Sequence, residues 1–173
     1  MVVRVRRAAC GDAAAIAMVH VRSWQAAYQG LLPQAYLDSL DPGQRRDRWE
    51  RILAETTCSR SATLLAESTE GVVGFARLCP TRDDDGDPAI VGEITSIYLL
   101  PAAWGTGIGT QLMQQSLRVF ETCYQQATLW VLDTNERARR FYEIGGWLAD
   151  GAIKRDRTHG FVLTKVRYRR SVG

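Results

Sequence analysis

The feature that most constrains this chain is a glycine-rich turn between an apolar segment and an amphipathic one. Residues 90–100 have the pattern of a buried strand, Gly105, Gly107 and Gly109 follow, and a helical pattern covers residues 108–124. In a strand–turn–helix unit, unpaired backbone N–H groups and the positive end of the helix dipole point to one place. The turn therefore predicts either a tight chain reversal without a ligand or an anion site suited to phosphate.

The glycine spacing separates this turn from other phosphate-binding loops. The order is G-x-G-x-G, whereas a dinucleotide-binding turn has G-x-G-x-x-G and opens a βαβ unit. The turn also lies past the midpoint of 173 residues, with few strand–helix units after it. Neither G-x-x-x-x-G-K-[ST] nor G-x-S-x-G occurs. These observations argue against a dinucleotide-binding domain, a P-loop nucleotide hydrolase and a serine hydrolase.

The periodicity of the whole chain predicts a mixed α/β (α+β) fold. At roughly 150 residues per domain, residues 1–173 are expected to form one domain. A cluster of helices comes first, and a mixed, mostly antiparallel sheet follows. Strands are expected at residues 2–7, 62–67, 72–78, 90–100, 127–132, 147–154 and 161–168, and helices at residues 12–28, 33–40, from 42 onward, 108–124 and 135–144.

Composition excludes several classes of partner and site. The net charge is only +3 and no apolar run reaches the roughly 18 residues of a membrane helix, so neither nucleic acid nor a membrane is expected. Two histidines and four scattered cysteines predict no metal site, and the absence of a signal-peptide pattern predicts a cytoplasmic protein. Ten basic residues stand against three acidic ones between Arg137 and Arg170, which indicates either a solvated face or an anionic ligand.

A second informative stretch covers residues 129–147. A strand leads into a helix on which Asn135, Ala138 and Tyr142 recur at i, i+3 and i+7. The three residues are therefore expected on one face of that helix. Tyr142 either presents a weak acid on this face or packs as an amphipathic aromatic side chain.

Together the two stretches resemble the GNAT superfamily of acyl-CoA-dependent N-acetyltransferases. The turn is similar to the acetyl-CoA motif [Q/R]-x-x-G-x-[G/A], and the second stretch matches N-x-x-A-x-x-F-Y-x-x-x-G-[F/W] at every specified position. One position departs, because Trp104 stands where the family commonly has Gln or Arg. The resemblance implies a splayed, mostly antiparallel central sheet flanked by helices, acetyl-CoA as cosubstrate and no covalent enzyme intermediate.

The resemblance also implies two catalytic residues. Tyr142 matches the tyrosine that protonates the departing CoA thiolate, and Glu93 stands where many members carry a general-base glutamate. Strand alternation predicts Glu93 and Thr95 on one face with Ile97 and Leu99. On that basis Glu93 is expected to take the amine proton directly or through one water.

Binding residues are implied in the same way. The acceptor is expected between the first two helices and the closing hairpin, where Trp24 and Tyr28 at i, i+4 would form an aromatic wall suited to an amine. The implied cofactor-binding residues are Ile97, Tyr98, Leu99, Trp104, Gly105, Thr106, Gly107, Ile108, Gly109, Thr110, Asn135 and Ala138.

The implied function is transfer of an acetyl group from acetyl-CoA to a primary amine of a small molecule. Within the same chemistry, a protein N-terminus or a lysine is the alternative acceptor. A non-catalytic acyl-CoA-binding sensor and a protein that binds another phosphate ligand are alternatives of a different class. The sequence leaves a homodimer open.

Overall fold

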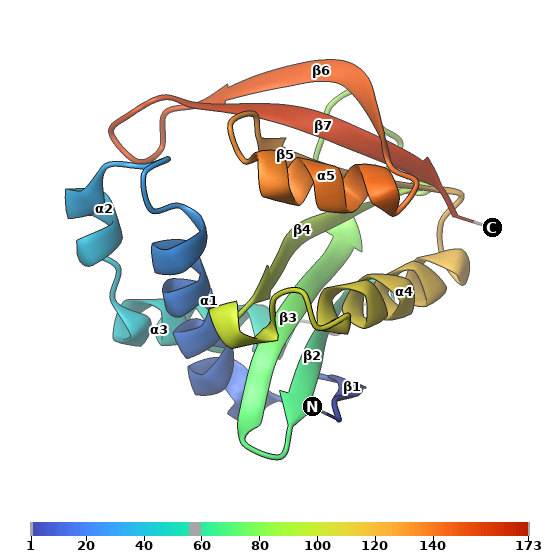
Figure 1. The fold of residues 1–173 in the computed structure, drawn as a ribbon. Coiled ribbons are helices and arrows are strands. Elements are labelled where there is room, and N and C mark those ends of the chain that lie inside the picture. Colours follow the sequence, from blue (N-terminus) through green and yellow to red (C-terminus); the bar gives the residue numbers. More distant parts are fainter. Residues whose placement is uncertain (1, 56–59, 173) are drawn as a thin grey trace.

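A central sheet with the strand order β1-β2-β3-β4-β5-β7-β6 organises the computed structural model, which describes residues 2–55 and 60–172 (Figure 1). Cys58, one of the four cysteines, lies outside these ranges. Of the neighbouring strand pairs, β4–β5 is parallel and the others are antiparallel, which confirms the predicted mixed sheet. The strands are β1 (Arg4–Arg7), β2 (Ala62–Ser68), β3 (Gly71–Pro80), β4 (Val91–Leu99), β5 (Gln126–Leu132), β6 (Leu148–Asp156) and β7 (Leu163–Ser171).

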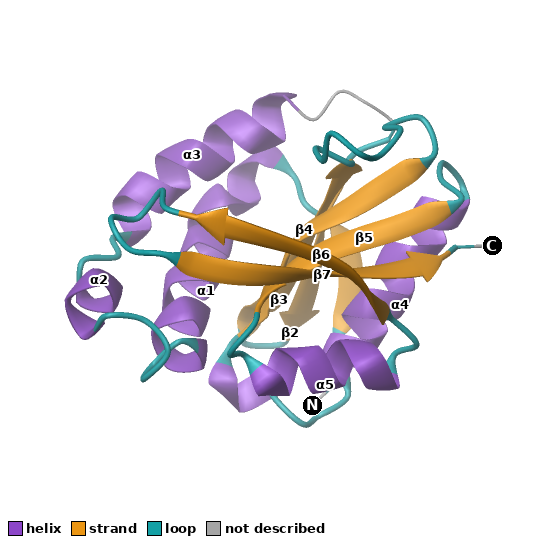
Figure 2. Ribbon diagram, turned by 90° about the horizontal axis from the view of Figure 1, so that it is seen from above, coloured by secondary structure: helices purple, strands orange, loops and turns teal. Residues whose placement is uncertain are grey.

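Helices cover both faces of this sheet (Figure 2). On one face, α1 and α3 pack on Leu65 of β2 and Phe75 of β3. On the other, α4 and α5 enclose a larger core that includes Phe120 and Trp147, both fully buried. The helices are α1 (Ala13–Ala27), α2 (Gln34–Asp38), α3 (Pro42–Glu55), α4 (Ile108–Glu121) and α5 (Glu136–Ile144), with short 3-10 helices at Cys10–Asp12 and Pro101–Ala103.

The sheet splays between β4 and β5. These parallel strands pair only at their N-terminal ends, from Val91 opposite Gln126 to Ile94 opposite Leu129. Beyond that point β4 stays beside β3, while β5 stays beside β7. The strands diverge, so among the residues described no strand lies beside the free edge of the second half of β4. This confirms the expected splayed sheet.

A β-bulge interrupts β4 just where the splay begins. Arg77 of β3 lies opposite Ser96, but the next residue, Leu78, lies opposite Ile94. Thr95 is therefore the extra residue, and regular alternation of side chains stops there.

The bulge changes which β4 side chains share a face. Ile97 packs into the core beneath α4 and α5, whereas Tyr98 packs with α1 and α3 on the opposite face. Residues opposite each other in the ladder share a face, so the pairings of Glu93 with Cys79 and of Ser96 with Arg77 place both on the Tyr98 side. The expectation that Glu93 and Ile97 share a face is wrong, because one inserted residue reverses the alternation.

Candidate active site

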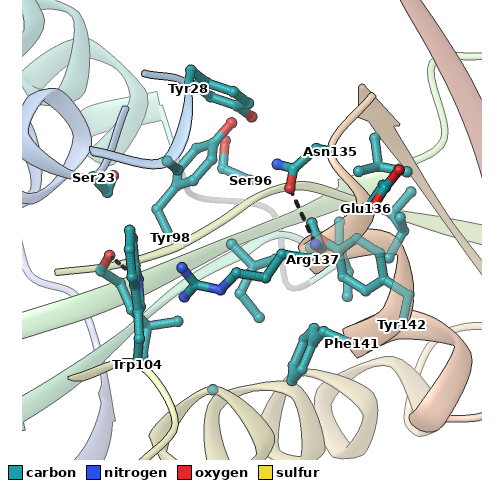
Figure 3. Close-up of a pocket in the computed structure, with 18 of the residues that line it drawn as sticks. Ser23, Tyr28, Ser96, Tyr98, Trp104, Asn135, Glu136, Arg137, Phe141 and Tyr142 are labelled. Carbon is teal, nitrogen blue, oxygen red and sulfur yellow. Dashed lines mark hydrogen bonds between the residues drawn. The ribbon is translucent and has the colours of Figure 1, made fainter. Parts of the chain in front are cut away.

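A cavity of about 1000 Å³ fills the wedge between β4 and β5 (Figure 3). Its walls come from the diverging halves of these strands, the glycine-rich turn, the first turn of α4, one face of α5 and the C-terminal end of α1. The sequence-predicted site residues that line it are Tyr28, Ile97, Tyr98, Leu99, Trp104, Gly105, Gly107, Gly109, Thr110, Asn135, Ala138 and Tyr142.

Three predicted binding residues direct their side chains elsewhere. Trp24 lies behind Tyr28, with ring centroids 5.0 Å apart and edge-to-face geometry. The Thr106 hydroxyl donates to the carbonyl of Ala103 at 2.7 Å, and the Ile108 side chain is 2% exposed in an apolar cluster. Any contact of Thr106 or Ile108 with a ligand in the cavity would come from the backbone.

The free edge of β4 presents backbone groups to the cavity. In an antiparallel pair, alternate residues direct N–H and C=O away from the partner strand. The Leu100 N–H donates to the Val73 carbonyl at 2.8 Å, so the alternation directs the backbone groups of Ile97 and Leu99 toward the wedge. The Leu99 carbonyl accepts a hydrogen bond from the Trp104 indole at 3.0 Å. The N–H and C=O of Ile97 and the N–H of Leu99 thus remain directed at the cavity.

The glycine-rich turn sets the N-terminus of α4 at one end of the cavity. Gly105 and Gly107 have φ values of +71° and +84°, and Gly107 is the N-cap of α4. A Cβ at either position would meet no atom within 4 Å, so backbone conformation rather than crowding requires glycine here. The first helical bond joins the Gln111 N–H to the Gly107 carbonyl at 3.1 Å. The preceding N–H groups of the first turn have no helical partner and are placed for an anion.

Asn135 begins α5 at the opposite wall of the cavity. Its side-chain carbonyl accepts a hydrogen bond from the Ala138 N–H at 3.1 Å, which is an N-cap. This contact commits the carbonyl oxygen to the helix and leaves the amide nitrogen directed toward the cavity (Figure 3). Asn135, Ala138 and Tyr142 all line the cavity, as a common face of α5 would require.

Tyr142 is held deep in the wedge. Its side chain is 7% exposed and its ring packs against Trp147 and Tyr168, with centroids 6.4 and 6.1 Å away. Within the part of the chain that the structure describes, its hydroxyl makes no hydrogen bond. Burial, with a smaller contribution from Tyr98, raises the pKa of Tyr142 well above its ordinary value. Tyr142 is therefore a protonated donor at neutral pH.

A second group of aromatic side chains closes the other end of the cavity. The hydroxyls of Tyr28 and Tyr98 are turned toward each other, with Ser96 beside them (Figure 3). Burial raises the pKa of both tyrosines, so both stay neutral. Behind them, the Tyr36 hydroxyl of α2 lies 3.0 Å from Nδ1 of His159 in the β6–β7 loop. The first helices and the closing hairpin therefore meet at this end.

Glu93 lies beside the cavity rather than in its lining. Its side chain is about 2% exposed, and its two oxygens accept hydrogen bonds from the Arg82 guanidinium at 2.7 and 3.1 Å. The Arg82 backbone N–H adds a third bond at 3.1 Å. The Arg82 side chain is 66% exposed, so water reaches the pair from that side. A proton from the cavity would reach Glu93 only through water, and its catalytic role remains a prediction.

Several lining residues escaped the sequence analysis. Ser96 and Trp130 come from strands whose divergence has no local sequence signal. Arg137 does have a local sequence signal. A cation in the first turn of a helix is unfavourable beside the positive end of the dipole, so its presence there indicates a nearby anion or another stabilising contact. The missed polar and aromatic lining residues are Ser23, Thr95, Ser96, Trp130, Thr134, Glu136, Arg137 and Phe141.

Two classes of site are not seen in the described ranges. Residues 2–55 and 60–172 contain no group of three His, Cys, Asp or Glu side chains arranged to hold a metal ion. None of the helices described is long and apolar enough to cross a membrane.

Comparison with known proteins identifies similar sequences and folds. The model of the Acetyltransferase (GNAT) family matches residues 22–146. YuaI of Bacillus subtilis (strain 168), described as an uncharacterized N-acetyltransferase, is 30% identical over 135 residues, which are 77% of this chain and 73% of that protein. An uncharacterized N-acetyltransferase of Archaeoglobus fulgidus is 32% identical over 139 residues, 80% of this chain and 88% of that protein. The crystal structure of PaiA N-acetyltransferase from Thermoplasma acidophilum in complex with coenzyme A has the same fold, with a TM-score of 0.77, 19% identity and 99% coverage of both chains.

Proposed function

Because the chain belongs to the acetyltransferase (GNAT) family, we propose that it transfers the acetyl group of acetyl-CoA to a primary amine of a small molecule. One observation carries the proposal. A single cavity brings together an unoccupied strand edge, a helix N-terminus and a buried phenol with an unbonded hydroxyl. An extended thioester that ends in phosphates requires all three: the strand edge for its amides, the helix N-terminus for its phosphates and the phenol for its sulfur.

The parts of acetyl-CoA match the parts of the cavity. The pantetheine amides would add to the β4 edge at Ile97, as a peptide adds to a sheet. The pyrophosphate would lie at the N-terminus of α4, where the N–H groups after Gly107 lack helical partners. The thioester would then lie between the strands, beside Tyr142. The bound coenzyme A of the PaiA crystal structure supports this cosubstrate.

The reaction needs no covalent intermediate on the protein. The neutral amine attacks the thioester carbon, the C–N bond forms, and the C–S bond breaks as the tetrahedral oxyanion collapses. Tyr142 remains protonated until sulfur develops charge, and its hydroxyl then donates to the thiolate. An ordinary thiol, with a pKa of about 8.5, is a stronger acid than this phenol. Tyr142 therefore stabilises the thiolate by a hydrogen bond before any proton moves to sulfur. The proton that finally binds sulfur passes through Tyr142, which is reprotonated by the proton that the amine gives up, so the products are the amide and free CoA thiol and the protein is unchanged.

Glu93 is the proposed base that takes up the amine proton through water and releases it again before the next turnover. The bulge places it on the same face of β4 as Ser96 and Tyr98, which is the side where α1 and α3 pack on the sheet. Arg82 compensates its charge, so a water chain rather than direct contact would carry the proton.

The acceptor end favours a small molecule over a folded protein. Tyr28 and Tyr98 form an aromatic wall of the cavity, and the contact between Tyr36 and His159, outside the lining, joins α2 to the β6–β7 loop nearby. An aromatic wall suits a compact amine, whereas a peptide would need an open groove.

Two measurements test this function. Calorimetry with CoA, ATP and NAD in parallel should show binding of CoA alone, and stronger binding of ATP or NAD would refute the site assignment. Release of free CoA from acetyl-CoA should then be measured across panels of small amines and of peptides. Turnover with small amines supports the proposal. Turnover confined to peptides would show that the acceptor is a peptide or protein instead, and CoA binding with no turnover across both panels favours a sensor.

A further inference from the structure

Arg137 crosses the cavity from α5 to the glycine-rich turn. Its guanidinium carbon lies 3.5 Å from the ring centroid of Trp104, which is stacking distance (Figure 3). The two residues come from opposite walls, and both line the cavity. Trp104 is itself fixed, because its indole N–H donates to the Leu99 carbonyl at 3.0 Å. The guanidinium is therefore held in place by a rigid platform.

The position of Arg137 is unfavourable unless an anion is nearby. It is the second residue of α5, where the helix dipole presents partial positive charge. Among the residues described, it forms no ion pair and no hydrogen bond, and burial lowers the pKa of its guanidinium. Glu136, the acidic lining residue next to it, points away from Trp104 (Figure 3). Arg139 on the same helix contrasts with it, because it donates to the Asp133 carbonyl and the Tyr168 hydroxyl.

The stacking leaves the donors of Arg137 available. A guanidinium that lies face-on over an aromatic ring keeps its N–H groups at the edge, where they form paired hydrogen bonds with a phosphate. Trp104 also begins the segment that leads through Gly105 and Gly107 into α4. A phosphate at the N-terminus of α4 would thus lie in the same part of the cavity as this cation.

We propose that Arg137, positioned by Trp104, is a phosphate ligand of acetyl-CoA. The inference rests on the proposed function, since it requires that CoA occupies the cavity. The first position of the glycine motif holds Trp104 rather than a residue with a phosphate-binding side chain, and α5 supplies the cation from the opposite wall. Arg137 binds either the pyrophosphate or the 3′-phosphate, which share the same chemistry.

The test compares Arg137→Met with Arg140→Met, a change at another exposed arginine of the same helix that does not line the cavity. Calorimetric affinity for CoA should fall roughly 10- to 100-fold in Arg137→Met, the range for a hydrogen bond to a charged group, and should stay within about twofold in Arg140→Met. Arg137→Lys, which keeps the charge, should lose less than Arg137→Met. Circular dichroism should show that all three variants are folded.

Ligands that lack phosphates separate this role from a packing role. Pantetheine, measured by displacement of CoA, should bind Arg137→Met as well as it binds the parent. Dephospho-CoA, which lacks the 3′-phosphate, identifies the phosphate that Arg137 binds. If Arg137→Met also binds dephospho-CoA more weakly than the parent does, the ligand is the pyrophosphate; if the two proteins bind it equally well, the ligand is the 3′-phosphate. Unchanged CoA affinity in Arg137→Met, or an equal loss for pantetheine, overturns the inference. If the parent protein itself does not bind CoA, the proposed function fails instead.

Discussion

Replacing Glu93 by Gln separates its structural contribution from its catalytic one. The substitution keeps the shape of the side chain and removes the charge that faces the Arg82 guanidinium. Glu93 accepts three hydrogen bonds from Arg82, two of them from the charged group. Gln can accept one or two of them, but its amide N–H groups then face another donor.

The expected loss of stability follows from this geometry. A hydrogen bond to a charged group contributes about 1.5–3 kcal/mol, and Glu93 is buried while Arg82 can recover hydration through its exposed side. A loss of about 2 kcal/mol is therefore expected, which lowers Tm by roughly 4–8 °C in a chain of this length. Glu67→Gln is the matched control, because Glu67 is bound by the Arg6 guanidinium at 2.8 and 3.0 Å, far from the cavity on β2.

The catalytic part is measured by the pH dependence of turnover in the two variants. With Glu93 as the base, Glu93→Gln should lower turnover at neutral pH by roughly 100-fold and flatten the rising limb of the profile, while CoA affinity stays unchanged. Glu67→Gln should leave the profile in place. A Glu93→Gln profile that superimposes on that of the parent, together with the lower Tm, would show that Glu93 only anchors Arg82.

Three further outcomes are expected. Tyr142→Phe should reduce turnover by roughly 10- to 10⁴-fold with little change in CoA affinity, since it removes only the unbonded hydroxyl; unchanged turnover with a good acceptor rules out its role. Burial lowers the pKa of His20 to about 3, so below pH 6.5 the unfolded chain binds a proton at His20 that the folded chain does not. The free energy of unfolding, measured with urea, should therefore fall by about 1.4 kcal/mol per pH unit between pH 6 and 4. His20→Gln should reduce that slope, and an unchanged slope would assign it to other groups. Gly107→Ala should destabilise the fold by about 1–2 kcal/mol because φ is +84°, and an unchanged Tm would contradict the conformational argument.

Much of the fold could be predicted because its signals are local. Periodicity located the described strands and α-helices to within a few residues, except for the end of α3, and missed the two short 3-10 helices. The face expected to be shared by Asn135 and Tyr142 follows from helical spacing alone. The turn at Gly105 and Gly107 was recognised because left-handed backbone conformations require glycine, whatever surrounds them.

The missed features depend on contacts between distant segments. Thr95 has no sequence property that marks it as a bulge. The face of the sheet on which Glu93 lies follows only from the pairing of β4 with β3. The same holds for Arg82, which lies in a loop eleven positions before Glu93, yet covers both of its oxygens. Trp24 has the helical spacing of a wall residue, but Tyr28 occupies that place and Trp24 packs behind it.

The basic C-terminal third shows why charge must be assigned residue by residue. Arg167 is 5% exposed and donates to three carboxylates, including Asp85 at 2.6 Å and Asp150 at 2.7 Å, so its charge is compensated within the fold. Arg139 donates to a backbone carbonyl and to Tyr168. Of the basic residues described between positions 137 and 170, Arg137 is the one that lines the cavity. The net excess of positive charge could not separate a solvated face from an anionic ligand, because most of these side chains have structural partners. The argument for phosphate binding depends instead on one guanidinium, stacked on Trp104 at the dipole end that would repel it.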